Sequence, residues 1–143
     1  MTGSASCDLG WSLQKAVYGQ LSNDTGVAAA LGTPARIYDT APKRPTFPFV
    51  TFGEWRVAPL SGAPDTFEHD IKIRVFSRYE GRKETRLAMA AIHGALHDAP
   101  LVPVGRSLIS FRFLFADIFL RADGRTWNGI MRFRAVDTTE TID

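Results

Sequence analysis

Two long apolar-rich segments within residues 107–136, joined at Asp123-Gly124, restrict the fold of this chain more than any other feature. An Asp-Gly pair between such segments indicates a β-hairpin, because the central residues of a tight hairpin turn need positive φ angles. When the strands are paired outward from this turn, one face is apolar throughout. Its predicted pairs are Leu120–Trp127, Ile118–Gly129, Ala116–Met131 and Leu114–Phe133. A shift by one residue would exchange the two faces, so the apolar face fixes the register.

The opposite face of the predicted hairpin combines aromatic rings with arginine. Its predicted pairs are Phe119–Asn128, Asp117–Ile130, Phe115–Arg132 and Phe113–Arg134. Subunit interfaces are rich in aromatic residues and arginine, so we favour a contact surface between protein chains here. The residues predicted to form it are Phe111, Phe113, Phe115, Phe119, Arg132 and Arg134.

Two other uses of this aromatic face remain open. The N-terminal helix of the same chain can cover part of it, or the rings can stack on the bases of single-stranded nucleic acid. The order of the predicted strands does not match an RRM domain. Residues 129–133, Gly-Ile-Met-Arg-Phe, also lack the RNP1 signature. We therefore place nucleic-acid binding third.

The composition fits one globular domain over residues 1–143. The chain is 45% hydrophobic and 22% charged, and its net charge of +2 does not call for a polyanionic partner. No apolar run approaches the ~20 residues of a membrane span. The first eight residues lack the pattern of a secretion signal. Cys7 is the only cysteine, which excludes an intrachain disulfide and indicates assembly in a reducing cytoplasm.

The remaining elements are predicted from hydrophobic periodicity, turn residues and prolines. Helices are expected over residues 9–21, 27–31 and 79–97, and strands over residues 49–57 and 67–77 ahead of the hairpin. This order, α-α-β-β-α-β-β, predicts an α+β fold with a mainly antiparallel four-stranded sheet and helices packed on one face. We expect residues 1–7 and 137–143 to be flexible.

Residues 58–65, with the sequence APLSGAPD, have little capacity to pack. Such a segment between two strands predicts a mobile projecting loop that becomes ordered on contact with a partner. The residues predicted to make this contact are Pro59, Leu60, Ser61, Gly62, Ala63, Pro64 and Asp65.

The sequence offers little for catalysis or for metal binding. His93 and His97 have the i, i+4 spacing of metal ligands, with His69 or Asp98 as a third ligand, but no HExxH motif is present. Two histidines on a helix surface are the commoner case. His69 and its acidic neighbours suggest acid–base chemistry, although a solvated strand end is the simpler reading. With no GxSxG or GxGxxG motif, we predict no catalytic, cofactor-binding or metal-binding residues.

Seven segments occur in an order and spacing that resemble a known family. They are LQKAVYGQL (13–21), VAAALG (27–32), RIYD (36–39), PKRPTFPFVTFG (42–53), HDIKIRVFSR (69–78), AAIHGALHDAPL (90–101) and ADGRTWNGIMRFRA (122–135). Over residues 13–135 the chain resembles the short tail-completion or tail-terminator proteins of tailed phages, prophages and gene transfer agents.

This resemblance implies a structural virion protein and no enzyme. Such proteins form rings, here expected to be hexameric, that cap the tail tube, stop its polymerisation and supply the surface that joins the head. The implied partners are further copies of the chain, the tail tube protein and the head–tail connector or neck proteins. DNA passes through the lumen without sequence recognition. The expected location is the head–tail junction of a particle assembled in the bacterial cytoplasm, with no membrane contact and no cofactor.

Overall fold

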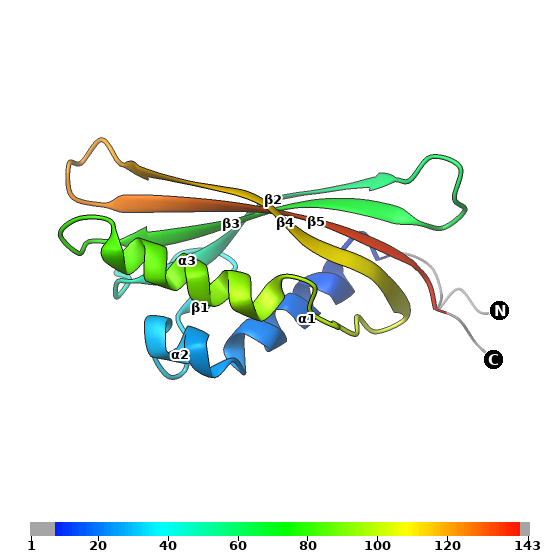
Figure 1. Ribbon diagram of the computed structural model, residues 1–143, viewed down its shortest axis with the longest axis horizontal. Helices are drawn as coiled ribbons and strands as arrows, with labels where there is room; N and C mark the ends of the chain where they lie inside the picture. The colour runs from blue at the N-terminus through cyan, green and yellow to red at the C-terminus, as the bar shows by residue number, and fades with distance from the viewer. Residues whose placement is uncertain (1–7, 141–143) are drawn as a thin grey trace.

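The computed structural model describes residues 8–140, in which three helices lie on one face of a five-stranded sheet (Figure 1). The elements are α1 (Trp11–Ser22), α2 (Thr25–Leu31), β1 (Ile37–Tyr38), β2 (Phe49–Pro59), β3 (Phe67–Ser77), α3 (Lys83–Leu96), β4 (Arg106–Leu120) and β5 (Trp127–Thr139). Among these described residues the other face of the sheet carries no helix, and we call it the uncovered face. The α+β class and the helices on one face are thus confirmed.

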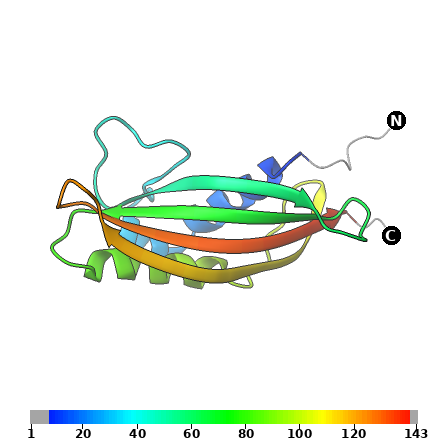
Figure 2. The same cartoon turned by 90° about the horizontal axis from the view of Figure 1, so that it is seen from above.

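The strands lie in the order β1-β2-β3-β5-β4, which makes β4 an edge strand (Figure 2). All neighbours are antiparallel except β1, which pairs in parallel with β2 through Ile37–Val50 and Tyr38–Thr51. The prediction of four strands is therefore wrong by one. A strand of two residues is too short to show any periodicity, and only its pairing with β2 reveals it.

Two helices begin later than predicted, because positive φ angles end the preceding turns. Leu9 and Gly10 have φ angles of 58° and 99°, so α1 begins at Trp11. Asp8, just ahead of this turn, accepts a hydrogen bond from the Ser12 backbone N–H at 2.9 Å. Gly81 has a φ of 84°, and α3 begins after it.

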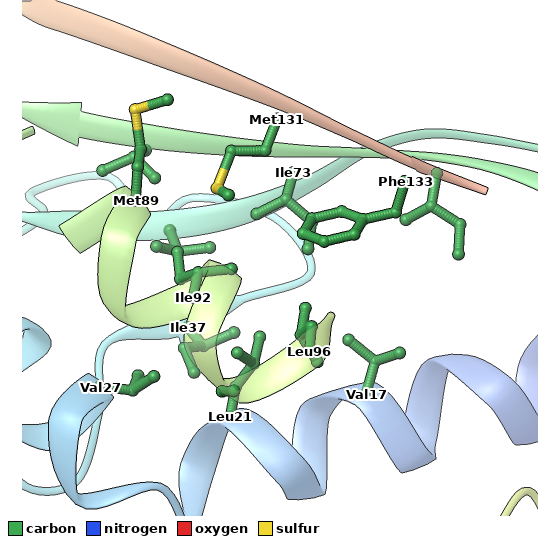
Figure 3. Packing of buried hydrophobic residues seen from close by; sticks show 14 of the residues in the cluster. Val17, Leu21, Val27, Ile37, Ile73, Met89, Ile92, Leu96, Met131 and Phe133 are labelled. Atoms are coloured by element: carbon green, nitrogen blue, oxygen red, sulfur yellow. The ribbon is translucent and has the colours of Figure 1, made fainter. Parts of the chain in front are cut away.

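The core lies between the sheet and two layers of helix. Figure 3 shows Val17 and Leu21 of α1 directed toward Leu96 of α3, with Met131 and Phe133 of β5 on the far side of α3. All five side chains are at most 1% exposed. Full burial of one such side chain contributes about 1.5–3 kcal/mol, so this cluster fixes the helices against one face of the sheet.

The C-terminal end of the described chain is more ordered than predicted. Asp137, Thr138 and Thr139 belong to β5, and Asp137 is only 2% exposed, so the expected flexibility is wrong for these residues. Residues 1–7 and 141–143 lie outside the described part. None of the helices in residues 8–140 is long and apolar enough to cross a membrane.

Candidate functional site

The strand β4 changes its register with β5 at Leu114. From Leu120–Trp127 to Phe115–Arg132 the pairing is as predicted, but Phe113 takes the place opposite Phe133. Leu114 is the additional residue of a β-bulge, which places two residues of one strand opposite one of the other. The predicted pairs Leu114–Phe133 and Phe113–Arg134 are therefore wrong.

The bulge divides the predicted contact residues between the two faces of the sheet. Phe111 and Phe113 lie on the helix-covered face, where Phe111 is 1% exposed and the Phe113 ring meets the ring of His93 edge-on at 4.9 Å. Their predicted place beside the arginines is wrong, since Phe111 is buried and Phe113 is partly buried against the core of the same chain. The four residues that do lie together on the uncovered face are Phe115, Phe119, Arg132 and Arg134.

The arginines of the uncovered face form ion pairs with carboxylates of β3. Arg132 donates to Asp70 through Nε at 3.1 Å and Nη2 at 2.5 Å, and Arg134 Nη2 lies 3.0 Å from Glu68 Oε2. The hydrogen bond from Arg134 lowers the pKa of Glu68, and the hydrogen bonds that Arg132 donates to Asp70 raise the pKa of Arg132. These guanidinium groups are thus neutralised within the face.

A third carboxylate extends this charge pattern to β2. Glu54 accepts hydrogen bonds from Lys72 at 2.5 Å and from Arg74 at 2.6 Å. These two bonds lower the pKa of Glu54 to about 2. Alternating charges therefore run across β2, β3 and β5.

The edge of β4 has two halves with different surroundings. In the closed half, residues 106–113, Phe113 N–H donates to His97 Nδ1 at 3.1 Å and Phe111 C=O accepts from Asp98 N–H at 2.9 Å. In the open half, residues 114–120, no second strand within residues 8–140 pairs with this edge. Its exposed apolar side chains are Leu114 (51%), Phe115 (47%), Phe119 (44%) and Leu120 (44%). A long apolar edge of this kind favours pairing with another chain.

The predicted contact loop is held by its own hydrogen bonds. Pro59 belongs to β2, and the turn that follows is closed by Leu60 N–H to Thr66 C=O at 2.8 Å. Arg106 Nη2 also donates to Asp65 C=O at 2.7 Å. The expected mobility thus differs from the structure, because a buried arginine anchors the loop from β4. A partner contact by this loop stays a prediction.

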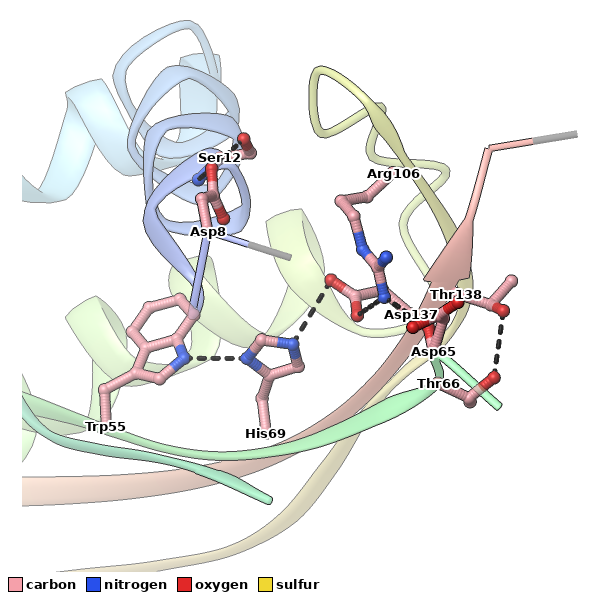
Figure 4. Close-up of polar contacts among 9 residues, drawn as sticks. All are labelled: Asp8, Ser12, Trp55, Asp65, Thr66, His69, Arg106, Asp137 and Thr138. Atoms are coloured by element: carbon pink, nitrogen blue, oxygen red, sulfur yellow. Dashed lines mark hydrogen bonds and ion pairs between the residues drawn. The ribbon is translucent and has the colours of Figure 1, made fainter. Parts of the chain in front are cut away.

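A buried polar network that the sequence does not predict lies beneath the sheet (Figure 4). Trp55 Nε1–H donates to His69 Nδ1 at 3.0 Å, and His69 Nε2 lies 3.2 Å from Asp137 Oδ2 in a contact too bent for a regular hydrogen bond. Arg106 Nη2 donates to Asp137 Oδ1 at 3.0 Å. His69, Arg106 and Asp137 are all buried, so the network ties β2, β3, β4 and β5 together at one end of the sheet.

The charge of Asp137 is balanced inside this network. Burial by itself raises the pKa of Asp137, but the contact with His69 and the hydrogen bond from Arg106 outweigh it and hold the pKa below its ordinary value. His69 Nδ1 accepts the indole N–H, so the proton of the neutral imidazole lies on Nε2. The reading of His69 as part of a solvated strand end is wrong. His69 shares one face of the strand with Ile71 and Ile73, and this alternation in the sequence indicates that His69 is buried.

His93 of α3 and His97, the residue that follows this helix, take part in packing. The rings of His93 and His97 stack at 5.1 Å, and His97 Nε2 lies 3.3 Å from Asp98 Oδ2. Within residues 8–140 no three His, Cys, Asp or Glu side chains are placed to hold a metal ion.

Comparison with known proteins gives a consistent result. A family model described as "Tail completion protein gp17" matches residues 15–137. Among solved structures, a chain of one described as "Virion of native gene transfer agent (GTA) particle" has a TM-score of 0.83 and 31% sequence identity. The match covers 93% of this chain and 99% of that chain. A comparison with curated proteins finds no match.

Proposed function

Since this chain belongs to the tail completion protein gp17 family and is a structural protein of a phage-like virion tail, we propose that it is a ring-forming tail terminator. In this role, copies of the chain form a ring, hexameric by our proposal, on the last layer of the tail tube. The ring stops polymerisation of the tube and offers its other side to the connector or neck proteins of the head. DNA then passes through the lumen without sequence recognition.

The observation that carries this proposal is the open half of β4. An edge strand with exposed Phe115, Phe119 and Leu120 is an aggregation hazard for a protein that acts alone. In a ring, the neighbouring subunit covers this edge, which then forms the contact between the two subunits. Membership of the family indicates that the protein belongs to a phage-like particle. The open half of β4 supports the proposal of how the subunits contact one another.

The ion pairs of the uncovered face favour this role over single-strand nucleic-acid binding. Arg132 and Arg134 are engaged by Asp70 and Glu68, so phosphate has to compete with carboxylates already in place. A nucleic-acid platform predicts affinity that falls steeply with salt. We expect no single-strand affinity in a low-salt titration, and a steep salt dependence would favour the alternative.

The function is tested by removing the gene from a producing strain and measuring tails by electron microscopy. We expect tails of irregular length that lack heads, restored by the unchanged gene. Phe119→Asp in the open half should fail to restore them. Leu87→Asp, at a still more exposed apolar position on α3, is the control and should restore them. Tails of normal length joined to heads in the absence of the protein would overturn the proposal.

A further inference from the structure

The sheet has a second open edge opposite β4. The strand β1 pairs only with Val50 and Thr51 of β2. Residues 52–59 of β2 therefore pair with no other strand on that side within residues 8–140. The open half of β4 and this open part of β2 lie on opposite sides of the same sheet (Figure 2).

The strand directions allow these two edges to pair. Each of the contacts β2–β3, β3–β5 and β5–β4 is antiparallel, so β4 also runs antiparallel to β2. A second copy rotated about an axis near the strand direction thus presents its β2 antiparallel to β4. The combined sheet keeps the antiparallel pattern at the junction.

Full overlap of the two open edges brings opposite charges together. When Leu114 lies opposite Pro59 of the next copy, Asp117 lies opposite Arg56. Both are on the uncovered face, because Asp117 pairs with Ile130 and Arg56 pairs with Asp70. Among residues 8–140 neither Asp117 nor Arg56 makes an ion pair of its own. Opposite charges directly across two strands stabilise their pairing.

We propose that the open half of β4 pairs with residues 53–59 of β2 in a second copy of this chain, with Asp117 opposite Arg56. This inference rests on the proposed ring and identifies its contact. The contact is head to tail, because two different surfaces meet, and contacts of this type produce closed rings.

The helix-covered side of the junction is apolar. In the same register Ile118 meets Trp55 and Ala116 meets Val57. Beyond them, the β2 bulge between Phe52 and Trp55 brings Leu120 beside Phe52. Phe52 also lines a groove of about 230 Å³ along α1, together with Trp11 and Tyr18. Leu120 of one copy thus enters an apolar groove of the next.

In this register each copy is displaced along the strand direction relative to the copy before it. This displacement, the stagger, fits a closed ring of strands. Within one copy Arg56 lies level with Arg134 and Asp117 lies level with Ile130, four residues away along β5. Four residues span about 13 Å, and four strands advance about 19 Å around the ring. The strands are then tilted by about 35°, which is within the range of closed β-barrels.

The direction of the stagger decides which face turns inward. In Figure 2 the uncovered face points to the viewer. In the proposed register each further copy would continue beyond β4 with a shift toward the 121–126 turn. When the sheet is viewed from the uncovered face, the strands run around the ring axis with a left-handed slope. When it is viewed from the helix-covered face, the same strands have a right-handed slope. Right-twisted strands slope right-handed when a barrel is seen from outside. The helices thus face outward, and the uncovered face lines the channel.

Disulfide trapping in assembled particles tests the pairing. Cys7→Ser chains carrying either Asp117→Cys or Arg56→Cys are produced together, and the particles are oxidised. Directly opposed strand residues have Cα separations of about 4.5–5.5 Å, within the range of a disulfide. We expect a covalent dimer only from the mixture. A chain with both substitutions should give a ladder that ends in one closed species.

The matched control replaces Arg56→Cys by Ala90→Cys, at an exposed position of α3, and should give no dimer. Particles with normal tails that contain both variants but no dimer would overturn the pairing. If tails still depend on the protein in that case, only this contact is wrong and the proposed function stands. A dimer in particles whose tails do not need the protein would support the contact and contradict the function.

Charge exchange provides a second measurement that needs no cysteine. Asp117→Arg and Arg56→Asp should each reduce the yield of joined particles at least several-fold, because like charges then face each other. The two reversals together should restore the yield to within about twofold. Thermal unfolding of the purified variants shows whether they fold. Equal defects in the single and double variants, all folded, would overturn the pairing.

Discussion

The two halves of β4 belong to one continuous strand but have opposite surroundings. In the closed half Arg106 and Phe111 are buried, and the segment after α3 hydrogen-bonds to the strand edge. In the open half Phe115 and Phe119 are more than two-fifths exposed, and no strand within residues 8–140 covers the edge. The bulge at Leu114 separates the halves. One additional residue thus divides a part that stabilises the fold from a part that we assign to assembly.

The largest difference between the halves is expected for their phenylalanines. Phe111→Ala removes a buried ring and should reduce the free energy of unfolding by about 4 kcal/mol. Phe119→Ala in the open half should reduce it by less than about 1 kcal/mol, because the ring is already largely in water. Urea denaturation of both variants measures this. Equal losses would show that the open half is also part of the folding core.

The carboxylates of the two halves should also differ. Asp137→Asn leaves the buried guanidinium of Arg106 without its counter-charge and should cost about 3 kcal/mol of unfolding free energy. Asp117→Asn in the open half is the matched control, with no measurable loss expected in the isolated chain. The same denaturation experiment compares them.

Acid should weaken the closed half through the same carboxylate. The pKa of Asp137 is lower in the folded chain than in the unfolded chain. Its contribution is therefore complete above the unfolded pKa of about 3.8 and is lost as the pH falls toward the folded value. Denaturation between about pH 5 and pH 2 should show a shallower decline for Asp137→Asn than for the unchanged chain. Identical slopes would mean that Asp137 does not carry the effect.

A smaller effect is expected where α3 passes beneath the open half. A Cβ on Gly129 would lie 2.5 Å from Met89 Sδ and 2.9 Å from Thr85 Cγ2. Gly129→Ala should therefore cost about 1–2 kcal/mol, since the flexible end of Met89 gives way only in part. Thermal unfolding measures this, with Gly94→Ala as a control because a Cβ there meets no atom within 4 Å. A stabilised Gly129→Ala would contradict the close packing.

The smallest effect is expected on the uncovered face. Glu54→Gln removes two exposed ion pairs and should leave the midpoint of denaturation within experimental error. The ion pairs are better detected by nuclear magnetic resonance, where Glu54 should titrate with a pKa of about 2. A pKa near 4.5, the ordinary value, would mean that Lys72 and Arg74 do not hold this carboxylate.

The hairpin illustrates what the sequence can predict. The register from Leu120–Trp127 to Phe115–Arg132 follows from the apolar pattern and is correct. The turn itself differs from the two-residue type: only Gly124 has positive φ, and Asp123 accepts backbone N–H bonds from Arg125 and Thr126. Any loop of the right length that joins these strands therefore gives the same register.

The prediction fails at Leu114 for a physical reason. Phe113 and Leu114 are both large and apolar, so either satisfies the pattern of a buried face. Their placement is decided by contacts distant in sequence, namely His93 with the Phe113 ring and His97 with the Phe113 N–H. The same limit applies to Asp137, whose partners Arg106 and His69 come from two other strands. Hydrophobic patterns locate strands, whereas bulges and buried ion pairs depend on tertiary contacts.

Hydrogen exchange along β4 tests most directly whether the open half is used for assembly. Amides of residues 114–120 that point away from β5 should exchange rapidly in the isolated chain and slowly in assembled tails. The amide of Phe113 in the closed half should exchange slowly in both, because it already donates to His97 Nδ1. Equal exchange of residues 114–120 before and after assembly would contradict the account.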